Sequence, residues 1–320
     1  MAGMRNVLTS IALAAALGAT TLGTTTLGTA TPALSQTRVA VAYTATIDVA
    51  PLFVATDKGM FSKRGIEVTP QLIQVNSLIP PALVSDSVQI GMPTASTFLQ
   101  AVDGGLDLTV VSGLNFTRKD DKNFGILART GTNIAKAQDL VGKKMGVPGL
   151  NAFLHVLGRE WLRANGVDPK QVTYVETAFP QMNEIMKSGN VDAVIGAEPF
   201  QSRIIQAGNG KIIAYLTSQL PEDLPIVFFA STSKWADANP QAAKAFKDGM
   251  AEGMEYTMAH LDEARAITAK YLKLPIEIVA SVAMPKFGVD VKADSLASWL
   301  DIMKSQNMVT RDVAVGPLIR

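Results

Sequence analysis

The feature that most constrains the fold is an internal repeat of the order strand, helix, strand, helix, strand, helix, strand. The first copy begins with an apolar run at 38–43 and ends with another at 108–111, and the second copy runs from 144–147 to 211–214. The first helix of each copy is followed by a glycine, Gly65 or Gly166, which is the residue type that commonly ends a helix with positive φ. Strands alternating with such helices predict two α/β lobes, each with a parallel-type sheet covered on both faces.

The inner parts of the two copies agree as well. In each copy a polar turn leads into a short apolar strand, and a helix and one or two glycines follow that strand. The helices predicted within the copies cover 50–64, 94–102, 153–165 and 199–206. After about residue 220 the pattern becomes helical, with helices predicted at 240–258, 262–271, 275–281 and 293–305. These last helices are expected to cover the lobes and tie them together.

Composition narrows the possible functions. The chain has 29 Lys and Arg against 28 Asp and Glu, so its net charge of +1 gives no global attraction for nucleic acid or an acidic membrane. Cysteine is absent, which excludes disulfides, cysteine-ligated zinc, iron–sulfur clusters and thiol catalysis. Only His155 and His260 could supply imidazole, so a histidine-rich metal site is excluded and no metal is expected.

Residues 1–35 are typical of a secretory signal peptide. Arg5 is the only charged residue before Arg38, and the intervening segment is rich in Ala, Leu, Gly and Thr. Small residues at positions 33 and 35 predict cleavage before Gln36. A membrane anchor is the alternative, but the purely apolar stretch at 7–17 is shorter than the ~20 residues that a bilayer requires. We therefore expect export to a periplasm, without a lipid anchor because no cysteine stands at the cleavage site.

Two α/β lobes in series imply a place for a ligand. In open α/β sheets a ligand binds outside the carboxyl ends of the strands. When two lobes turn these edges toward each other, a cleft forms between them, and a hinge allows the lobes to close around the ligand.

Five segments of the chain resemble periplasmic solute-binding proteins of ABC importers, in the nitrate/sulfonate/taurine group that also includes proteins similar to thiamine-pyrimidine-precursor binders. The segments are APLFVATDKGMF at 50–61, RGIEV at 64–68, DLVGKKMGVPG at 139–149, SGNVDA at 188–193 and EPF at 198–200. The resemblance extends over roughly 38–305, and its specificity lies in the order and spacing of the segments.

The resemblance implies a two-lobed, type II periplasmic-binding-protein fold of class α/β, with a ligand cleft and a helical C-terminal part. By this analogy lobe one comprises 36–114 plus 217–320, and lobe two comprises 115–216. The family has no catalytic residues as a rule, so the resemblance implies a protein that is not an enzyme and has no cofactor. Carried onto this sequence, the cleft residues are Tyr43, Thr44, Thr46, Asp48, Asn76, Thr94, Ala95, Ser96, Asn115, Gly149, Leu150, Asn151, Phe153, Phe179 and Glu198.

The chemistry of these residues favours an organic ligand. Helix starts near Thr94 and Asn151 present backbone N–H groups that attract anions, although plain N-capping is an alternative role for both residues. Asp48 and Glu198 would repel a bare anion but could pair with the amine of a zwitterion such as taurine. For Glu198, a purely structural role is the alternative to ligand contact. Aromatic residues of the cleft, Tyr43 among them, could form an apolar wall or belong to the core.

The function implied by the resemblance is a periplasmic receptor that binds a sulfonate, a taurine-like zwitterion or a carboxylate between its lobes. Its transient partners would be an inner-membrane permease and the ATPase of that permease, and the receptor itself is expected to be a monomer. Two alternatives stay open: a ligand sensor that feeds a signalling receptor, and a pyrimidine-precursor binder.

Overall fold

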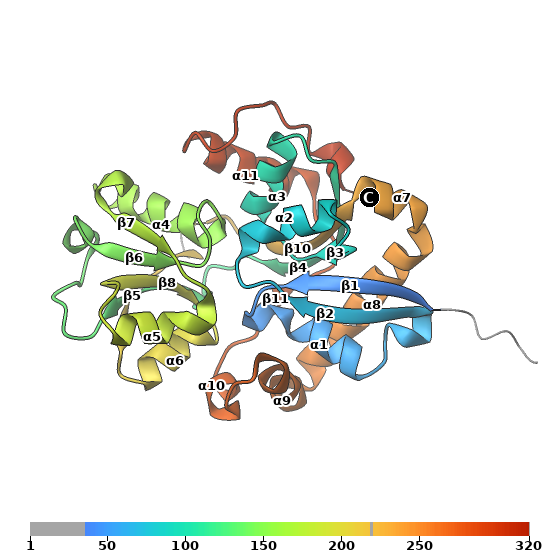
Figure 1. Cartoon of the computed structure of the whole chain (residues 1–320), viewed down its shortest axis with the longest axis horizontal. Coiled ribbons are helices and arrows are strands. Elements are labelled where there is room, and N and C mark those ends of the chain that lie inside the picture. The colour runs from blue at the N-terminus through green and yellow to red at the C-terminus, as the bar shows by residue number, and fades with distance from the viewer. Residues whose placement is uncertain (1–35, 218–219, 320) are drawn as a thin grey trace, which may run out of the picture. The chain divides into compact units, whose positions relative to one another are not determined.

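The computed structural model describes residues 36–217 and 220–319. The predicted signal peptide at 1–35 lies outside the described residues. Within these residues, no helix combines the length and the apolar character that crossing a membrane requires. The described chain builds two β-sheets, each with helices on both faces (Figure 1).

The first sheet has the strand order β11-β4-β10-β3-β1-β2. Its strands are β1 (Thr37–Tyr43), β2 (Ile66–Leu72), β3 (Ile90–Gly91), β4 (Leu108–Phe116), β10 (Pro225–Thr232) and β11 (Lys286–Phe287). β1 runs parallel to β2 and β3, with Val41 opposite Ile90, whereas β10 is antiparallel to both β3 and β4. We call this sheet and the helices packed on it the first lobe.

The second sheet has the strand order β7-β6-β8-β5-β9. Its strands are β5 (Phe124–Arg129), β6 (Lys144–Val147), β7 (Thr173–Glu176), β8 (Ala193–Ala197) and β9 (Gly210–Tyr215). β6 is parallel to β7 and β8, and β5 is antiparallel to β8 and β9. This sheet and its helices form the second lobe.

The predicted duplication is confirmed by the strand orders. The order β2-β1-β3-β10-β4 in the first sheet corresponds to β7-β6-β8-β5-β9 in the second. The inner antiparallel strand of each sheet follows a crossing of the chain, since β5 comes after β4 and β10 comes after β9. The chain thus changes sheets between Phe116 and Phe124 and returns between Tyr215 and Pro225; the lobe boundaries at 114/115 and 216/217 remain a prediction.

Two sequence-based expectations were wrong. The sheets are mixed and not purely parallel, and the chain after residue 220 is not simply helical, because β10 and β11 belong to the first sheet. β10 is buried along almost its whole length, and it is an apolar run without a period-two alternation. Such a run gives no periodicity that separates a fully buried strand from a buried helix.

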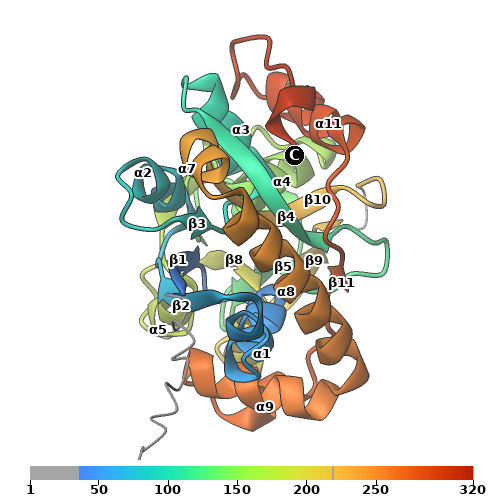
Figure 2. The ribbon, with the colours of Figure 1, turned by 90° about the vertical axis from the view of Figure 1, so that its right-hand side faces the viewer.

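Helices cover both faces of each sheet. In the first lobe, α2 and α3 lie on one face with α11 beyond them, and α1 and α8 lie on the other; in the second lobe, α4 lies opposite α5 and α6 (Figure 1). Figure 2 shows the long α8 passing β4 before it reaches α1. The helix bounds are α1 (Ala50–Asp57), α2 (Ile79–Val84), α3 (Ala95–Asp103), α4 (Phe153–Ala164), α5 (Met182–Lys187), α6 (Phe200–Gln206), α7 (Ser233–Ala238), α8 (Pro240–Ala259), α9 (Leu261–Leu272), α10 (Ile276–Ala280) and α11 (Ala293–Lys304).

Helix α1 is shorter than the predicted helix at 50–64. It ends at Asp57, and Gly59 then takes a φ of +66°, in the left-handed region that a continuing helix cannot use. A single 3-10 turn at Ser62–Arg64 follows, and it ends as expected at Gly65, where φ is +80°. The early end of the helix lets the turn fold back against α8.

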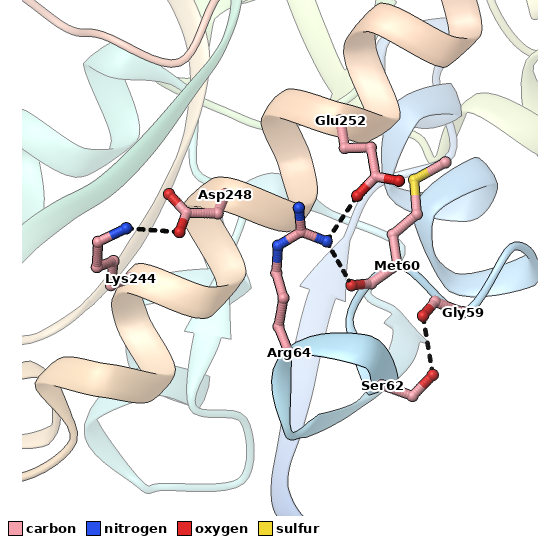
Figure 3. A network of polar contacts seen from close by, with 7 residues as sticks. All are labelled: Gly59, Met60, Ser62, Arg64, Lys244, Asp248 and Glu252. Carbon is pink, nitrogen blue, oxygen red and sulfur yellow. Dashed lines mark hydrogen bonds and ion pairs between the residues drawn. The ribbon is translucent and has the colours of Figure 1, made fainter.

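Polar contacts attach this turn to α8 (Figure 3). The Arg64 guanidinium donates to the Glu252 carboxylate at 2.6 Å and to the Met60 carbonyl at 2.8 Å. The turn is also closed on itself by the Ser62 hydroxyl, which donates to the Gly59 carbonyl at 2.9 Å. Because the ion pair is partly exposed, it orients the turn more than it stabilises the fold.

Contacts between the lobes occur on two sides. The Ile47 N–H donates to the Glu198 carbonyl at 2.9 Å, and the Gln306 side-chain amide donates to the Val156 carbonyl at 3.2 Å. The rings of Phe153 in α4 and Trp299 in α11 pack edge to face with centroids 5.4 Å apart. The second lobe therefore rests on α11 as well as on the loop after β1.

The close approach of α1 to α8 predicts a stability effect at Gly253. A Cβ atom added there would lie 2.6 Å from the Pro51 carbonyl oxygen, a backbone atom that has little freedom to move. We expect Gly253→Ala to destabilise the fold by about 1–3 kcal/mol, despite the better helix propensity of alanine. The melting temperature, measured by calorimetry, should fall by several degrees.

Gly316→Ala is the matched control, since an added Cβ there has no atom within 4 Å. A Gly253→Ala protein as stable as the control would show that α1 and α8 do not pack this closely.

Candidate functional site

A small cavity lies between the two lobes, at the carboxyl ends of β1, β3 and β6. Its volume is about 30 Å³. The first lobe contributes Thr44, Thr46, Asp48, Asn76, Thr94, Ile226 and Val227 to its lining, and the second contributes Phe124, Pro148, Ala152, Phe153, Leu154 and Phe179. A larger groove of about 590 Å³ borders Asp107 and Thr232, at the opposite edge of the first sheet. The smaller cavity occupies the place where open α/β sheets bind ligands.

Asp48 is the chemical centre of this cavity. It lies in the 3-10 turn Ile47–Val49 after β1 and is only 2% exposed. Its carboxylate accepts a short hydrogen bond from the Thr46 hydroxyl and one of 3.3 Å from the Asn115 amide. Among the described residues, no cationic side chain pairs with Asp48.

This arrangement is electrostatically costly. Burial raises the pKa of the Asp48 carboxyl above its ordinary value, and the charge of Asp121 raises it further, against the lowering effect of the bonds from Thr46 and Asn115. The Asn115 Oδ1 atom is buried and accepts no hydrogen bond from residues 36–217 or 220–319, which the structure describes. Of the described residues that line the cavity, Asp48 alone is ionisable. A buried carboxyl of this kind calls for a donor or a cation from outside the protein.

The other polar groups of the first lobe are largely occupied. The Asn76 side chain donates to the Met92 carbonyl at 3.0 Å and accepts from the Thr94 N–H at 2.9 Å, which fastens the loops after β2 and β3 together. The Thr94 hydroxyl caps α3 by accepting from the Thr97 N–H at 3.3 Å. N-capping, the alternative role considered for Thr94, is therefore present, although Thr94 also lines the cavity.

The second lobe presents a helix start and an apolar wall. The N-cap residue of α4 is Ala152, whose side chain cannot satisfy the first N–H groups of the helix. Beside this end the rings of Phe153 and Phe124 pack edge to face with centroids 5.4 Å apart, and Phe179 stacks near Phe200 at 6.2 Å. The cavity thus has uncapped N–H groups and aromatic surface on one side and the Asp48 carboxyl on the other.

The structure brings about half of the predicted site residues to the cavity. Those in the lining are Thr44, Thr46, Asp48, Asn76, Thr94, Phe153 and Phe179. Those placed elsewhere are Tyr43, Ala95, Ser96, Asn115, Gly149, Leu150, Asn151 and Glu198. Asn115 stands directly behind Asp48 as a hydrogen-bond donor, and Ala95 and Ser96 are fully buried in the first turn of α3.

Tyr43 and Glu198 have structural surroundings. The Tyr43 ring packs edge to face on Phe53 at 5.0 Å, within the core. The Glu198 carboxylate turns back to its own helix, where it accepts from the Ser202 hydroxyl and the Gln201 amide, each at 2.9 Å. Burial raises the pKa of Glu198, whereas the bonds from Gln201 and Ser202 lower it.

The loop at 149–151 approaches the first lobe instead of lining the cavity. A Cβ atom added at Gly149 would lie 3.6 Å from a methyl group of Val75. The Leu150 N–H donates to the Glu176 carboxylate at 2.8 Å, and the side chain of Leu150 is 45% exposed. Asn151 takes a φ of +62° and its N–H donates to His155 Nδ1 at 2.8 Å. The small size of Gly149 therefore permits an approach between the lobes.

Sequence reasoning missed six lining residues. Phe124, Ile226 and Val227 lie on β5 and β10, two strands that were not predicted. The others, Pro148, Ala152 and Leu154, flank predicted residues in the turn and helix after β6, so a wider window around that helix start would have included them. In the described part of the chain, no three His, Asp or Glu side chains come together as a metal site would require.

The two-lobed fold, with a cavity at the carboxyl ends of strands from both sheets, defines a periplasmic-binding-protein type of architecture. Residues 46–264 match the family model described as NMT1/THI5 like. The match covers more than half of the chain, and the protein therefore belongs to the NMT1/THI5-like family.

Two curated relatives illustrate the range of this similarity. The chain is 27% identical over 270 residues to the nitrate/nitrite binding protein NrtA of Synechococcus elongatus, covering 75% of this chain and 60% of that protein. It is 26% identical over 292 residues to the riboflavin-binding protein RibY of Chloroflexus aurantiacus, covering 89% and 77%. The match to NrtA thus spans less than two thirds of the relative's length.

Solved structures share the fold. The alkanesulfonate-binding protein SsuA from Xanthomonas axonopodis pv. citri superposes with a TM-score of 0.78 at 19% identity, over 89% of this chain and 98% of that one. The periplasmic nitrate-binding protein NrtA from Synechocystis PCC 6803 gives a TM-score of 0.75 at 19% identity, over 89% and 86%. The predicted two-lobed α/β fold is confirmed.

The isolated Asp48 carboxyl predicts a stability gain on its removal. A carboxyl whose folded-state pKa is raised destabilises the fold at pH values above that pKa. In Asp48→Asn the introduced amide can donate to the unpartnered Asn115 Oδ1 atom. We expect the variant to unfold at a temperature several degrees higher near neutral pH, from a gain of about 1–3 kcal/mol. The difference in unfolding temperature between the variant and the wild type should shrink as the pH falls toward about 4, the ordinary pKa of an Asp side chain.

The control is Asp301→Asn on α11, which removes the same charge from an exposed position. Thermal unfolding at a series of pH values compares the three proteins. An Asp48→Asn variant that is less stable than the wild type at every pH would contradict this account of the carboxyl.

Proposed function

We propose that this protein is a non-enzymatic, solute-binding receptor of the ABC-importer type that binds a small zwitterion between its lobes. Membership of the NMT1/THI5-like family, the two-lobed fold and a cavity at the carboxyl ends of both sheets support the general role. The observation that carries the ligand class is the buried Asp48 carboxyl, which has no cationic partner among the described residues.

The two walls of the cavity offer complementary charges. An amine of the ligand would take the place of the cation that Asp48 lacks, with a charge-assisted hydrogen bond. A sulfonate or carboxylate at the other end of the ligand would lie at the uncapped start of α4, where N–H groups and the helix dipole favour an anion. The phenylalanines between these two ends would contact the carbon skeleton. A bare inorganic anion such as nitrate would gain the second contact but would be opposed by Asp48.

The size of the cavity implies that the lobes move. A volume of about 30 Å³ is sufficient for one or two water molecules, so a ligand of several heavy atoms requires the walls to separate. Because the proposed contacts come from both lobes, the ligand would bind the closed arrangement more tightly than the open one. That difference in affinity is what a ligand needs to drive closure.

The proposal extends to partners and location. Relatives of this chain include the nitrate import ATP-binding protein NrtC and the bicarbonate transport ATP-binding protein CmpC of Synechocystis, which it matches over 35% and 39% of their lengths. We infer delivery of the ligand to a membrane permease that works with such an ATPase. The predicted signal peptide supports a periplasmic location, and we propose a monomer as the working form.

A second candidate ligand is a neutral nitrogen heterocycle. The three lining phenylalanines favour it, since they provide aromatic surface in the same cavity as the Asp48 acceptor. A ring N–H could donate to Asp48 in place of an amine. The similarity to RibY, a riboflavin-binding protein, and the predicted relation to pyrimidine-precursor binders support the same choice.

A calorimetric titration distinguishes these ligands. The panel contains taurine, ethanesulfonate without the amine, ethylamine without the sulfonate, sodium nitrate, riboflavin and a pyrimidine precursor. We expect taurine or a related amino acid or amino sulfonate to bind more tightly than either truncated molecule. In Asp48→Asn the affinity should fall by about ten- to a hundredfold, since a hydrogen bond to a charged group contributes about 1.5–3 kcal/mol.

Glu198→Gln serves as the matched control, because this partly buried carboxyl lies outside the lining. The affinity of this variant for the ligand should change less than threefold. If only riboflavin or the pyrimidine precursor binds, and Asp48→Asn abolishes that binding, the ligand is the heterocycle and not a zwitterion. Tight binding of nitrate that Asp48→Asn strengthens would overturn the assignment of Asp48 as the ligand's partner.

A further inference from the structure

A second hollow lies on the outer side of the second lobe, away from the cavity between the lobes. It is a groove of about 240 Å³ between α4 and the chain that leads into β7, the edge strand of the sheet. The residues that line it are His155, Arg159, Arg163, Asp168, Pro169, Lys170, Val172 and Tyr174. None of these residues lines the cavity between the lobes.

Arg159 lies in this groove without a counter-charge. Its side chain makes no hydrogen bond or ion pair with the described residues, although it is only partly exposed. Burial lowers the pKa of the guanidinium, and the positive charge of Arg163, one turn further along α4, lowers it more. Two neighbouring guanidinium groups repel each other, and the natural compensation is an anion between them.

His155 adds a buried hydrogen-bond donor at the inner end of the groove. It is 5% exposed, and its Nδ1 atom accepts from the Asn151 N–H at 2.8 Å. A neutral ring that accepts at Nδ1 carries its hydrogen on Nε2. This Nε2 atom is buried and has no hydrogen-bond partner among the described residues. The ring is neutral near pH 7, since burial, followed by the charge of Arg159, lowers its pKa to about 4.

Tyr174 supplies a further unsatisfied group. Its ring packs edge to face on His155 with centroids 4.3 Å apart, and its buried hydroxyl has no hydrogen-bond partner in the described part of the chain. Burial raises the pKa of this hydroxyl to about 12, so it remains a donor. Buried donors without acceptors are rare in folded proteins, and a bound ion is one of the explanations for them.

The charge at the rim of the groove is positive overall. Lys170 and Arg163 contribute two positive charges, and Asp168 contributes one negative charge. The Asp168 carboxylate accepts a hydrogen bond of 2.9 Å from the backbone N–H of Lys170. Arg163 has a long contact of 3.5 Å with Glu160, where both side chains are well exposed and the pairing is weak. Neither acidic group reaches Arg159 in an ion pair.

From these observations we propose that the groove formed by His155, Arg159, Arg163, Lys170 and Tyr174 binds the oxyanion of a small dissolved molecule, such as a phosphate or sulfate group. Arg159 and Arg163 would neutralise its charge, and the His155 ring and the Tyr174 hydroxyl would donate to its oxygens. A tetrahedral oxyanion has enough acceptor oxygens to satisfy both arginines, the His155 ring and the Tyr174 hydroxyl at once.

This site is independent of the ligand proposed for the cavity between the lobes. One hydrogen bond links the groove to the boundary between the lobes, because the Asn151 N–H that fixes the His155 ring belongs to the loop that approaches the first lobe at Gly149. An anion that orders the His155 ring would thereby also fix this loop.

The test is calorimetric titration of the protein with sodium phosphate and with sodium sulfate, in a buffer that contains neither anion. We expect saturable binding of at least one of them. Arg159→Gln should weaken it at least tenfold, and Tyr174→Phe, which removes only a hydroxyl, about three- to tenfold. Arg203→Gln is the matched control, since it removes the same charge from α6 of the same lobe, outside the groove.

Unfolding curves of the variants show whether each one is folded. Equal affinities in wild type and Arg159→Gln, or equal losses in Arg159→Gln and Arg203→Gln, would overturn the proposal, as would the absence of saturable binding. Phosphatidylglycerol vesicles provide a second arm. If the protein sediments with them through Arg159 while dissolved phosphate and sulfate fail to bind, the oxyanion belongs to a lipid headgroup and the small-molecule assignment is wrong.

Discussion

The architecture depends on one inner antiparallel strand in each sheet, β10 or β5, which enters the sheet as the chain crosses between the lobes. β10 lies between β3 and β4, and β5 lies between β8 and β9, so neither sheet is continuous until the chain has crossed. Both strands also carry cavity residues, Phe124 on β5 and Ile226 with Val227 on β10. Completing the core of each lobe and placing the cavity between them are therefore results of the same topology.

The duplication could be predicted from the sequence because it is built from local signals. Short apolar runs, helices of regular length and terminating glycines such as Gly65 and Gly166 recur in the same order, and the structure has both glycines at positive φ. The crossing strands gave no such signal. β5 and β10 are buried between other strands, and their partners are distant in sequence. The early end of α1 at Asp57 was missed because Gly59 and Gly65 are both able to end a helix.

The site was predictable where a side chain follows directly from the end of a strand. Thr44, Thr46 and Asp48 come straight after β1, and each lines the cavity. Gly149 and Glu198 were less predictable because their roles depend on what the other lobe and the local backbone place beside them. Gly149 allows Val75 to approach, and Glu198 offers its carbonyl to the Ile47 N–H while its carboxylate caps its own helix.

The buried Asp48 and the partly buried Glu198 at this boundary differ in a way that separates a structural role from a binding role. Glu198 accepts two hydrogen bonds of 2.9 Å from the first turn of the helix that follows it, where a negative charge is favoured. Asp48 accepts from one hydroxyl and, at 3.3 Å, from an amide whose own oxygen has no partner. Burial raises the pKa of both, yet only Asp48 faces a cavity. An incompletely satisfied carboxyl that opens toward the other lobe destabilises the unliganded fold, and a ligand with a suitable donor removes that destabilisation only when the lobes close.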